Sequence, residues 1–299
     1  MMPDRVSDSA SPGASSATAV RRRRRAATRF RVSLAVAAVA LALWAARIVE
    51  QHVSVRAALA EGEEAFRGGD FVRAADRFRA ALEIDPASTA VRLRLVAAYR
   101  MQYVPGGESA ANLDAAKQAL GEIARVLDRD PSNRAALLAA GEISDARSEY
   151  DRSREWYGRL AAIDSASAAA FAGMSAASLT EVSGAVLDAE ARAGALPAAF
   201  APRGSAPQAD GHPIANEDLR RSLAERWSGT IADGIDAASK AVTLDRGNER
   251  AMRTLEAWHQ LAADLAASPE EYSRHRTAAD EWRRKALAAR RLEAERSAQ

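Results

Sequence analysis

The fold is decided by residues 55–88, which read VRAALAEGEEAFRGGDFVRAADRFRAALEIDPAS. Two segments of this stretch carry apolar residues at intervals of three and four, the spacing that places them on one face of a helix. Gly68, Gly69 and Asp70 separate the segments and mark a turn, and the second segment stops before Pro86, which cannot continue a helix. The stretch therefore predicts two short amphipathic helices joined by a tight turn.

This helix pair has the spacing of a tandem repeat. The 34-residue helix-turn-helix repeat follows the pattern W-x2-L-G-x2-Y…A-x3-F…P. Residues 55–88, called unit one, match it at Gly62, Ala65, Ala74, Phe78, Ala81 and Pro86. Unit one therefore resembles a tetratricopeptide repeat, although Glu61 stands where the family prefers Leu. The resemblance implies a right-handed solenoid of antiparallel helix pairs, in which the first helix of each pair lines a concave groove.

Unit two follows with an interruption. Leu95 and Tyr99 occupy the Leu and Tyr positions of its first helix, and residues 103–112 then break the helical pattern with Pro-Gly-Gly. The second helix is expected over Leu113–Leu127. The closing prolines of units one and two are 45 residues apart instead of 34, so we predict an insertion of 11 residues in a loop at one edge of the stack.

Unit three, residues 134–167, has the regular length of 34 residues. It carries matching residues at Leu137, Gly141, Tyr150, Tyr157, Leu160 and Asp164. The first helix of unit four is expected from Ala168, and its helical pattern persists to Ala193. Residues 55–193 are therefore interpreted as consecutive tetratricopeptide-like repeats.

The composition changes over residues 194–216, where four prolines stand among Gly, Ser and Ala. No helical periodicity survives there, so we predict a linker. Helical patterns return over residues 217–244, 249–266 and 269–297, which would complete unit four and form unit five. The expected fold class is all-α, a solenoid of about five helix-turn-helix units preceded by a single transmembrane helix.

The composition supports this fold class and locates the charge. Hydrophobic residues make up 48% of the chain, many of them Ala, and aromatic residues only 5%, which favours close-packed helices over a sheet. There is no Cys, so disulfides, thiolate nucleophiles and Cys-ligated zinc are excluded. Residues 1–31 have a net charge of +6, whereas the whole chain has a net charge of +2. Residues 32–299 therefore have a net charge of −4. A mildly acidic body makes a nucleic-acid partner unlikely.

The membrane segment is predicted at residues 30–49. Residues 1–29 are rich in small polar residues and Arg, and we expect a disordered basic tail. Twenty residues span about 30 Å as a helix, the thickness of a hydrocarbon core, if the flanking Arg31 and Arg47 reach the interfaces. The Arg21–Arg25 cluster places the N-terminus in the cytoplasm. A signal peptide cleaved near Ala40-Leu41-Ala42 and a soluble Ala-rich helix remain alternatives.

The resemblance also implies which residues line the groove. These are Arg56, Leu59, Glu63, Phe66 and Arg67 in unit one, Ala90, Leu93, Ala97, Arg100 and Met101 in unit two, and Ala135, Leu138, Glu142, Asp145 and Ala146 in unit three. One subclass of the family clamps a carboxylate with Lys and Asn in this groove. Leu59 and Glu63 stand at those positions here, so a carboxylate clamp is not expected.

No other constellation in the sequence indicates a catalytic, metal or cofactor site. The four histidines are scattered along the chain with no ligand spacing. Gly68-Gly69 and Gly106-Gly107 lack the Gly-Lys-Ser/Thr of a phosphate loop, and Ser109 lacks the context of a nucleophile elbow. Four tryptophans at helical spacing indicate packing between helices.

We therefore expect a non-enzymatic, single-pass protein of the bacterial inner membrane, with its repeat domain in the periplasm. Its partner would be a protein or peptide held in the concave groove, and no cofactor or small-molecule substrate is expected. The alternative is a cytoplasmic tetratricopeptide adaptor whose Arg-rich tail contacts nucleic acid or anionic lipid. An enzyme would need a catalytic cluster within residues 194–216.

Overall fold

The computed structural model describes residues 50–194 and 216–297, with isolated residues between 41 and 47 and Ile214. In this part of the chain all regular structure is helical, which confirms the all-α prediction. A helix over residues 50–67 precedes the labelled helices. These are α2 (Phe71–Ile84), α3 (Thr89–Gln102), α4 (Ala110–Leu127), α5 (Arg134–Ala146), α6 (Tyr150–Ile163), α7 (Ala168–Arg192), α8 (Glu217–Leu244), α9 (Glu249–Asp264) and α10 (Pro269–Ser297).

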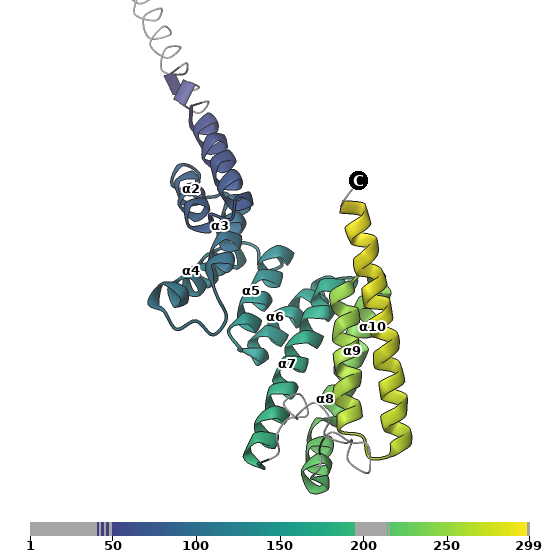
Figure 1. Cartoon of the computed structure of the whole chain (residues 1–299). Helices are drawn as coiled ribbons and strands as arrows, with labels where there is room; N and C mark the ends of the chain where they lie inside the picture. The colour runs from purple at the N-terminus through teal and green to yellow at the C-terminus, as the bar shows by residue number, and fades with distance from the viewer. Residues whose placement is uncertain are drawn as a thin grey trace, which may run out of the picture.

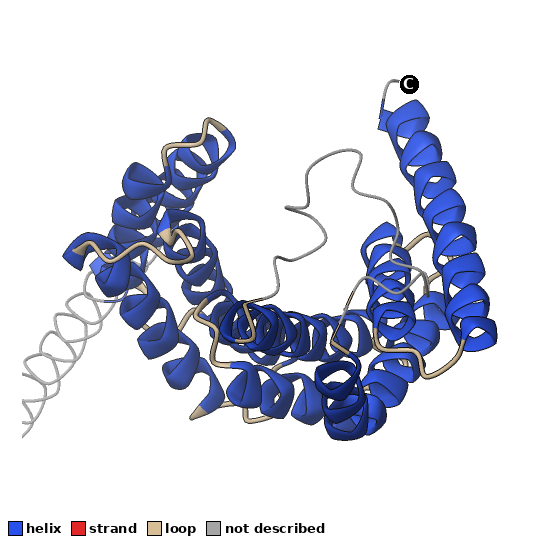
Figure 2. Cartoon of the chain, turned by 60° about the horizontal axis from the view of Figure 1, so that its bottom comes forward, coloured by secondary structure: helices blue, strands red, loops and turns tan. Residues whose placement is uncertain are grey.

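The helices form hairpins that stack side by side into an arch (Figure 1). Residues 50–67 pair with α2, as the Gly62 contact with Phe78 and the ion pair of Glu61 with Arg77 show. The other pairs are α3 with α4, α5 with α6, α7 with α8 and α9 with α10. Each pair packs on the next, so the structure is a solenoid of five helix-turn-helix units within the described residues. Figure 2 shows that the arch is open on one side.

The same turn separates the units wherever one hairpin ends and the next begins. An Asp stands directly after α2, α6 and α8 and three residues after the end of α4, and its carboxylate accepts a hydrogen bond from the backbone N–H two residues later. A Ser or Asn three residues after the Asp then caps the next helix with its side chain. The pairs are Asp85 with Ser88, Asp130 with Asn133, Asp164 with Ser167, and Asp245 with Asn248. The fourth turn identifies α8 as the end of unit four, although the linker precedes this helix.

The core inside each regular unit depends on an aromatic ring that lies against a glycine. A Cβ atom added to Gly62 would lie 2.6 Å from the Phe78 ring, and one added to Gly141 would lie 2.6 Å from the Tyr157 ring. Both distances are too short for any side chain, so only glycine lets the two helices approach this closely. Tyr157 also contacts Gly173 of α7 in the same way, which joins unit three to unit four.

The insertion in unit two forms an ordered loop at one edge of the stack. Asn112 closes the loop, because its side chain accepts from the Val104 N–H at 2.6 Å and donates to the carbonyls of Val104 and Gly107. Helix α4 begins at Ala110, three residues before the predicted start, because Ser109 caps it. Of the predicted linker, only Gly194, Ile214 and Asn216 belong to the described residues.

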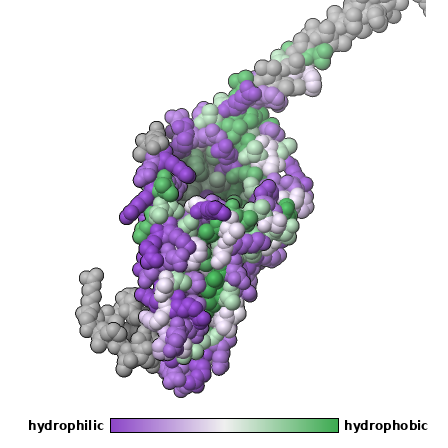
Figure 3. Space-filling model, turned by 90° about the vertical axis from the view of Figure 1, so that its right-hand side faces the viewer, coloured by the Kyte–Doolittle hydropathy of each residue, from purple (hydrophilic) through white to green (hydrophobic). Residues whose placement is uncertain are grey.

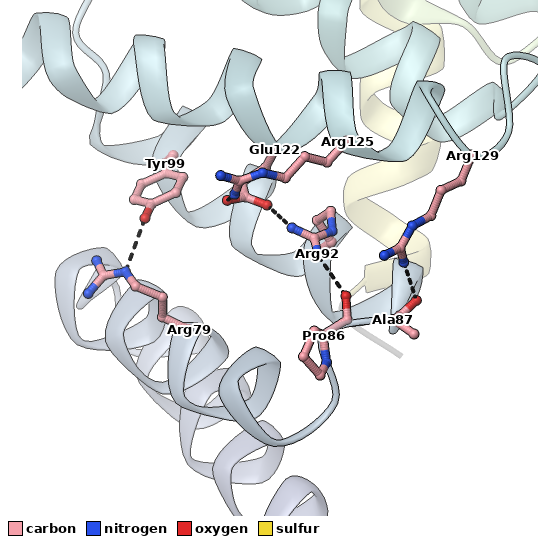
Figure 4. A network of polar contacts seen from close by, with 8 residues as sticks. All are labelled: Arg79, Pro86, Ala87, Arg92, Tyr99, Glu122, Arg125 and Arg129. Carbon is pink, nitrogen blue, oxygen red and sulfur yellow. Dashed lines mark hydrogen bonds and ion pairs between the residues drawn. The ribbon is translucent and has the colours of Figure 1, made fainter.

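A polar network holds unit two to the turn that follows unit one (Figure 4). Arg92 of α3 pairs with Glu122 of α4 and donates to the Pro86 carbonyl at 2.8 Å. Arg129 donates to the Ala87 carbonyl at 3.1 Å. The Arg92 and Glu122 side chains are only 10% and 12% exposed, so this ion pair is largely removed from water.

The C-terminal units share a core around Trp258 of α9, which is completely buried. Its Nε1–H donates to the Ser175 hydroxyl at 2.8 Å, and Ser175 donates to the Gly234 carbonyl at 2.7 Å. One side chain therefore links α7, α8 and α9. The burial of Trp258 agrees with the predicted packing role of the tryptophans.

Helix α7 is the one helix of the described residues whose length and composition would allow it to cross a membrane. It lies inside the solenoid against α5, α6, α8 and α9, and 44% of its most apolar window is buried. It is thus a core helix of the stack. The predicted membrane segment, residues 30–49, lies outside the described residues except for a few helical positions that include Leu41, Leu43 and Trp44.

Candidate protein-binding groove

The first helices of successive units lie closer to one another than the second helices do. Among the described helices, α3 contacts α5, α5 contacts α7, and α7 contacts α9. No comparable contact joins α2 to α4, α4 to α6, α6 to α8 or α8 to α10. A stack that is tighter on one side must bend toward that side, so the first helices line the concave surface of the arch. Seen from the α10 side, the molecule is hollowed, with hydrophobic side chains in the depth of the hollow and hydrophilic ones around it (Figure 3).

A slot opens between the first helices of units one and two. Its volume is about 140 Å³, and it is lined by Glu63, Phe66, Arg67, Phe78, Arg94 and Ala97. Phe66 is held by an edge-on contact with Phe71, whose ring centroid is 5.2 Å away. The slot thus combines apolar walls with charged side chains at its edge.

Ion pairs connect neighbouring units along the same surface. Arg94 of unit two lies 3.2 Å from Glu63 of unit one, and Arg100 of unit two lies 2.9 Å from Glu142 of unit three. Each pair joins two first helices, and the exposed parts of these side chains keep its strength modest. Arg67 has no ion-pair partner among the residues that the structure describes.

Deeper in the arch, Asp145 of α5 lies in a confined position. Its Oδ1 atom is buried and has no hydrogen-bond partner in the described part of the chain, and its Oδ2 atom is 4.0 Å from Arg250 of α9. Burial raises the pKa of Asp145, Arg250 lowers it, and nearby Glu142 raises it. Burial also raises the pKa of the Tyr157 hydroxyl, which the two carboxylates raise further.

The structure gathers only some of the predicted groove residues in the slot. Glu63, Phe66, Arg67 and Ala97 meet there, and Arg100 and Glu142 form the ion pair to unit three. Met101 is exposed. Leu59, Leu93 and Leu138 are half-buried and pack against the core, so they hold the helices together. Arg56 lines a separate hollow with Gln51, His52, Val55, Ile84 and Asp85.

Three residues of this surface were missed by the sequence analysis. Phe78 was identified only as a position of the repeat pattern, yet it also lines the slot. Arg94 and Arg250 reach across to carboxylates of other units. Their partners are 31 and 105 residues away, so only the stacking of the units reveals them.

Two of the four histidines that are scattered along the sequence meet in the structure. The Nδ1 atoms of His259 and His275 are 3.0 Å apart, across the hairpin of α9 and α10. They are 16 residues apart, and a helical hairpin brings such residues together when the turn lies between them. No group of three or more His, Cys, Asp or Glu in the described residues is arranged to hold a metal ion.

This histidine contact should make the α9–α10 hairpin sensitive to acid. Burial lowers the pKa of both rings, and the neighbouring histidine lowers the pKa of His259 further. For His275, Glu271 raises the pKa and Arg274 lowers it. The two histidines therefore bind protons more readily in the unfolded chain than in the folded hairpin. The free energy of unfolding of the hairpin should decrease as the pH falls from about 7 through the lowered pKa values.

Hydrogen exchange of the α9 and α10 amides, corrected for the intrinsic pH dependence, tests this expectation. Protection should decrease between pH 7 and pH 5 in the natural chain and decrease less in His275→Asn. Burial raises the pKa of Asp264 to about 6, so protonation of this carboxyl stabilises the fold as the pH falls, opposite to the effect of the histidines. Asp264 is present in both proteins, so its effect cancels in the comparison. Equal pH dependence of the two proteins would contradict the histidine assignment.

No family model matches this chain, and no curated protein matches it. Among solved structures it is similar to MamA from Desulfovibrio magneticus RS-1, starting at residue 41, with 15% identity and a TM-score of 0.48 over 77% of this chain and 96% of that one. A double mutant of MamA RS-1 has 14% identity and a TM-score of 0.48 over 80% and 96% of the two chains. Another crystal structure of MamA has 14% identity and a TM-score of 0.44 over 81% and 94%.

Proposed function

We propose that this protein is a scaffold that binds a segment of a partner protein in its concave groove, on the outer side of a bacterial inner membrane. The observation that carries the proposal is the slot between units one and two. A cavity of about 150 Å³ with apolar walls is large enough to bind benzene. A slot of about 140 Å³ can therefore take one large apolar side chain of a partner.

The arrangement around the slot supports a peptide ligand. Phe66 and Phe78 supply the apolar walls, and Arg67 lies at the edge with no ion pair in the described residues. An apolar anchor with a few polar contacts is the usual form of a hot spot in protein recognition. The ion pairs from Glu63 and Arg100 fix the spacing of the units, so that little freedom would be lost on binding.

Membrane anchorage is the second part of the proposal. Leu41, Leu43 and Trp44 are helical and about two-thirds exposed, with no packing partner in the described residues. Three large apolar side chains left in water are costly, and insertion into a bilayer would remove that cost. The cluster Arg21–Arg25 on the N-terminal side supports a cytoplasmic N-terminus.

Protease accessibility in fractionated cells tests this topology. The repeat domain should resist an added protease in intact cells and be digested in spheroplasts, in which the outer membrane is opened while the inner membrane stays intact. Digestion only after the inner membrane is breached would contradict the periplasmic placement. It would favour a cytoplasmic adaptor with a basic tail.

Filling the slot should block the partner. Ala97→Trp places a large ring where the partner side chain would sit, and the amount of partner recovered with the full chain after cross-linking should fall at least tenfold. Ala124→Trp, at an exposed position on the second helix of unit two, is the matched control and should leave recovery unchanged. Equal recovery from both variants, measured by quantitative mass spectrometry, would contradict a binding role for the slot.

A further inference from the structure

Helix α10 continues past the end of its hairpin. It covers Pro269–Ser297, whereas its partner α9 covers only Glu249–Asp264. The two helices are antiparallel, so the last turns of α10 extend beyond the first residue of α9 and stand beside the turn that joins α8 to α9. Figure 1 shows this end of α10 projecting from the stack. We call residues 283–297 the overhang, although Arg283 at its start still pairs with Glu256 of α9.

A cleft of about 870 Å³ lies between the overhang and this turn. Val242, Met252 and Trp282 supply its large apolar surface, together with small residues of α10. The α10 residues that line it are Trp282, Lys285, Ala288, Ala289, Leu292, Glu293 and Arg296. Their intervals of three and four put them on one face of the helix, the pattern by which a helix packs against another helix. In the described residues no helix occupies this position.

The cleft is basic at its edge. Arg246 and Arg296 line it and have no ion-pair partner among the described residues, whereas the Asp245 carboxylate accepts a hydrogen bond from the Gly247 N–H. The overhang carries six basic and two acidic side chains, a charge of +4. Residues 32–299 carry −4 in total, so residues 32–282 carry −8. Positive charge is therefore concentrated at one end of an acidic domain.

We propose that this cleft is a second interaction site, separate from the concave groove, and that it binds an acidic amphipathic helix of a partner protein. The apolar face of that helix would cover Trp282 and Leu292 with anchors at intervals of three and four. Its carboxylates would meet Arg246 and Arg296, which line the cleft. The net negative charge of residues 32–282 disfavours an acidic ligand elsewhere on the domain.

The site can be tested with the full chain and a designed helical peptide that carries Leu on one face and Glu on the other. A twin peptide with Lys in place of Glu reports the charge requirement. We expect the Glu peptide to bind at least tenfold more tightly than its Lys twin in a fluorescence anisotropy titration. Leu292→Asp, and separately Arg246→Glu with Arg296→Glu, should each weaken its binding at least tenfold.

Matched controls are available on the same helix. Leu287 is 50% exposed, close to the 55% of Leu292, but it does not line the cleft, so Leu287→Asp should change binding less than twofold. Arg290→Glu with Arg291→Glu makes the same charge change outside the cleft and should also have little effect. Equal affinity for the two peptides, or equal losses in the cleft and control variants, would overturn the proposal. Anionic lipid vesicles provide a further test. If they displaced the Glu peptide from the natural chain and bound Leu287→Asp but not Leu292→Asp, the cleft would be a membrane-binding surface and the proposal would be overturned.

Discussion

Arg92→Ala is expected to lower the free energy of unfolding of the first two units by about 3 kcal/mol. The change removes one partner of an ion pair whose side chains are 10% and 12% exposed, and leaves the Glu122 carboxylate buried. Arg125 still pairs with Glu122, which places the expected loss at the lower end of the range for broken buried pairs. The bond from Arg92 to the Pro86 carbonyl would also be lost.

Two comparison variants separate the buried pair from an ordinary surface contact. Arg79→Ala removes a side chain that is half exposed and bonded to Tyr99 and Asp76, and should cost less than about 1 kcal/mol. The double variant Arg92→Met with Glu122→Leu removes both charges and should be close to neutral. If Arg92→Ala and Arg79→Ala had equal effects, the buried pair of Arg92 and Glu122 in Figure 4 would not be what holds unit two to the turn after unit one.

Trp258→Ala is expected to cost about 4 kcal/mol, because it removes a completely buried ring that links α7, α8 and α9. The substitution would leave a cavity beside Gly234. The Trp258 ring lies so close to this glycine that a Cβ atom added to Gly234 would be 2.3 Å from the ring. Trp258→Phe keeps most of the ring and loses the bond to Ser175, and should cost about 1–2 kcal/mol.

Native-state hydrogen exchange distinguishes these two sites, because neighbouring repeats stabilise one another only through their shared interfaces. Arg92→Ala should lower protection mainly from residue 50 to α4, and Trp258→Ala mainly in α7 to α10. Uniform loss of protection along the whole chain in either variant would show that the units unfold together, contrary to a linear stack.

The helices and their order could be predicted from the sequence because their signals are local. Gly68-Gly69 ends the first helix, and Asp85 with Ser88 marks the step from unit one to unit two. The aromatic rings at Phe78 and Tyr157 have their glycine partners at fixed distances within the same repeat. Even the overhang of α10 is implied by the unequal lengths of the last two predicted helices.

The candidate site was less accessible from the sequence because it depends on how the units stack. Arg94 meets Glu63 only after unit two is placed beside unit one, and no local pattern specifies that register. His259 and His275 meet because the α9–α10 turn sets the alignment of two helices. Leu59 occupies a groove position by its place in the repeat, yet it packs against the core in the folded stack.

Site-specific photo-cross-linking tests the central claim most directly. A photoreactive methionine analogue placed at Met101, which is exposed and lies one helical turn beyond Ala97 of the slot, should form an adduct with a partner protein in cells. The same group placed at Ala124, on the second helix of unit two, should form none. An adduct at position 124 with none at position 101 would contradict recognition through the concave groove.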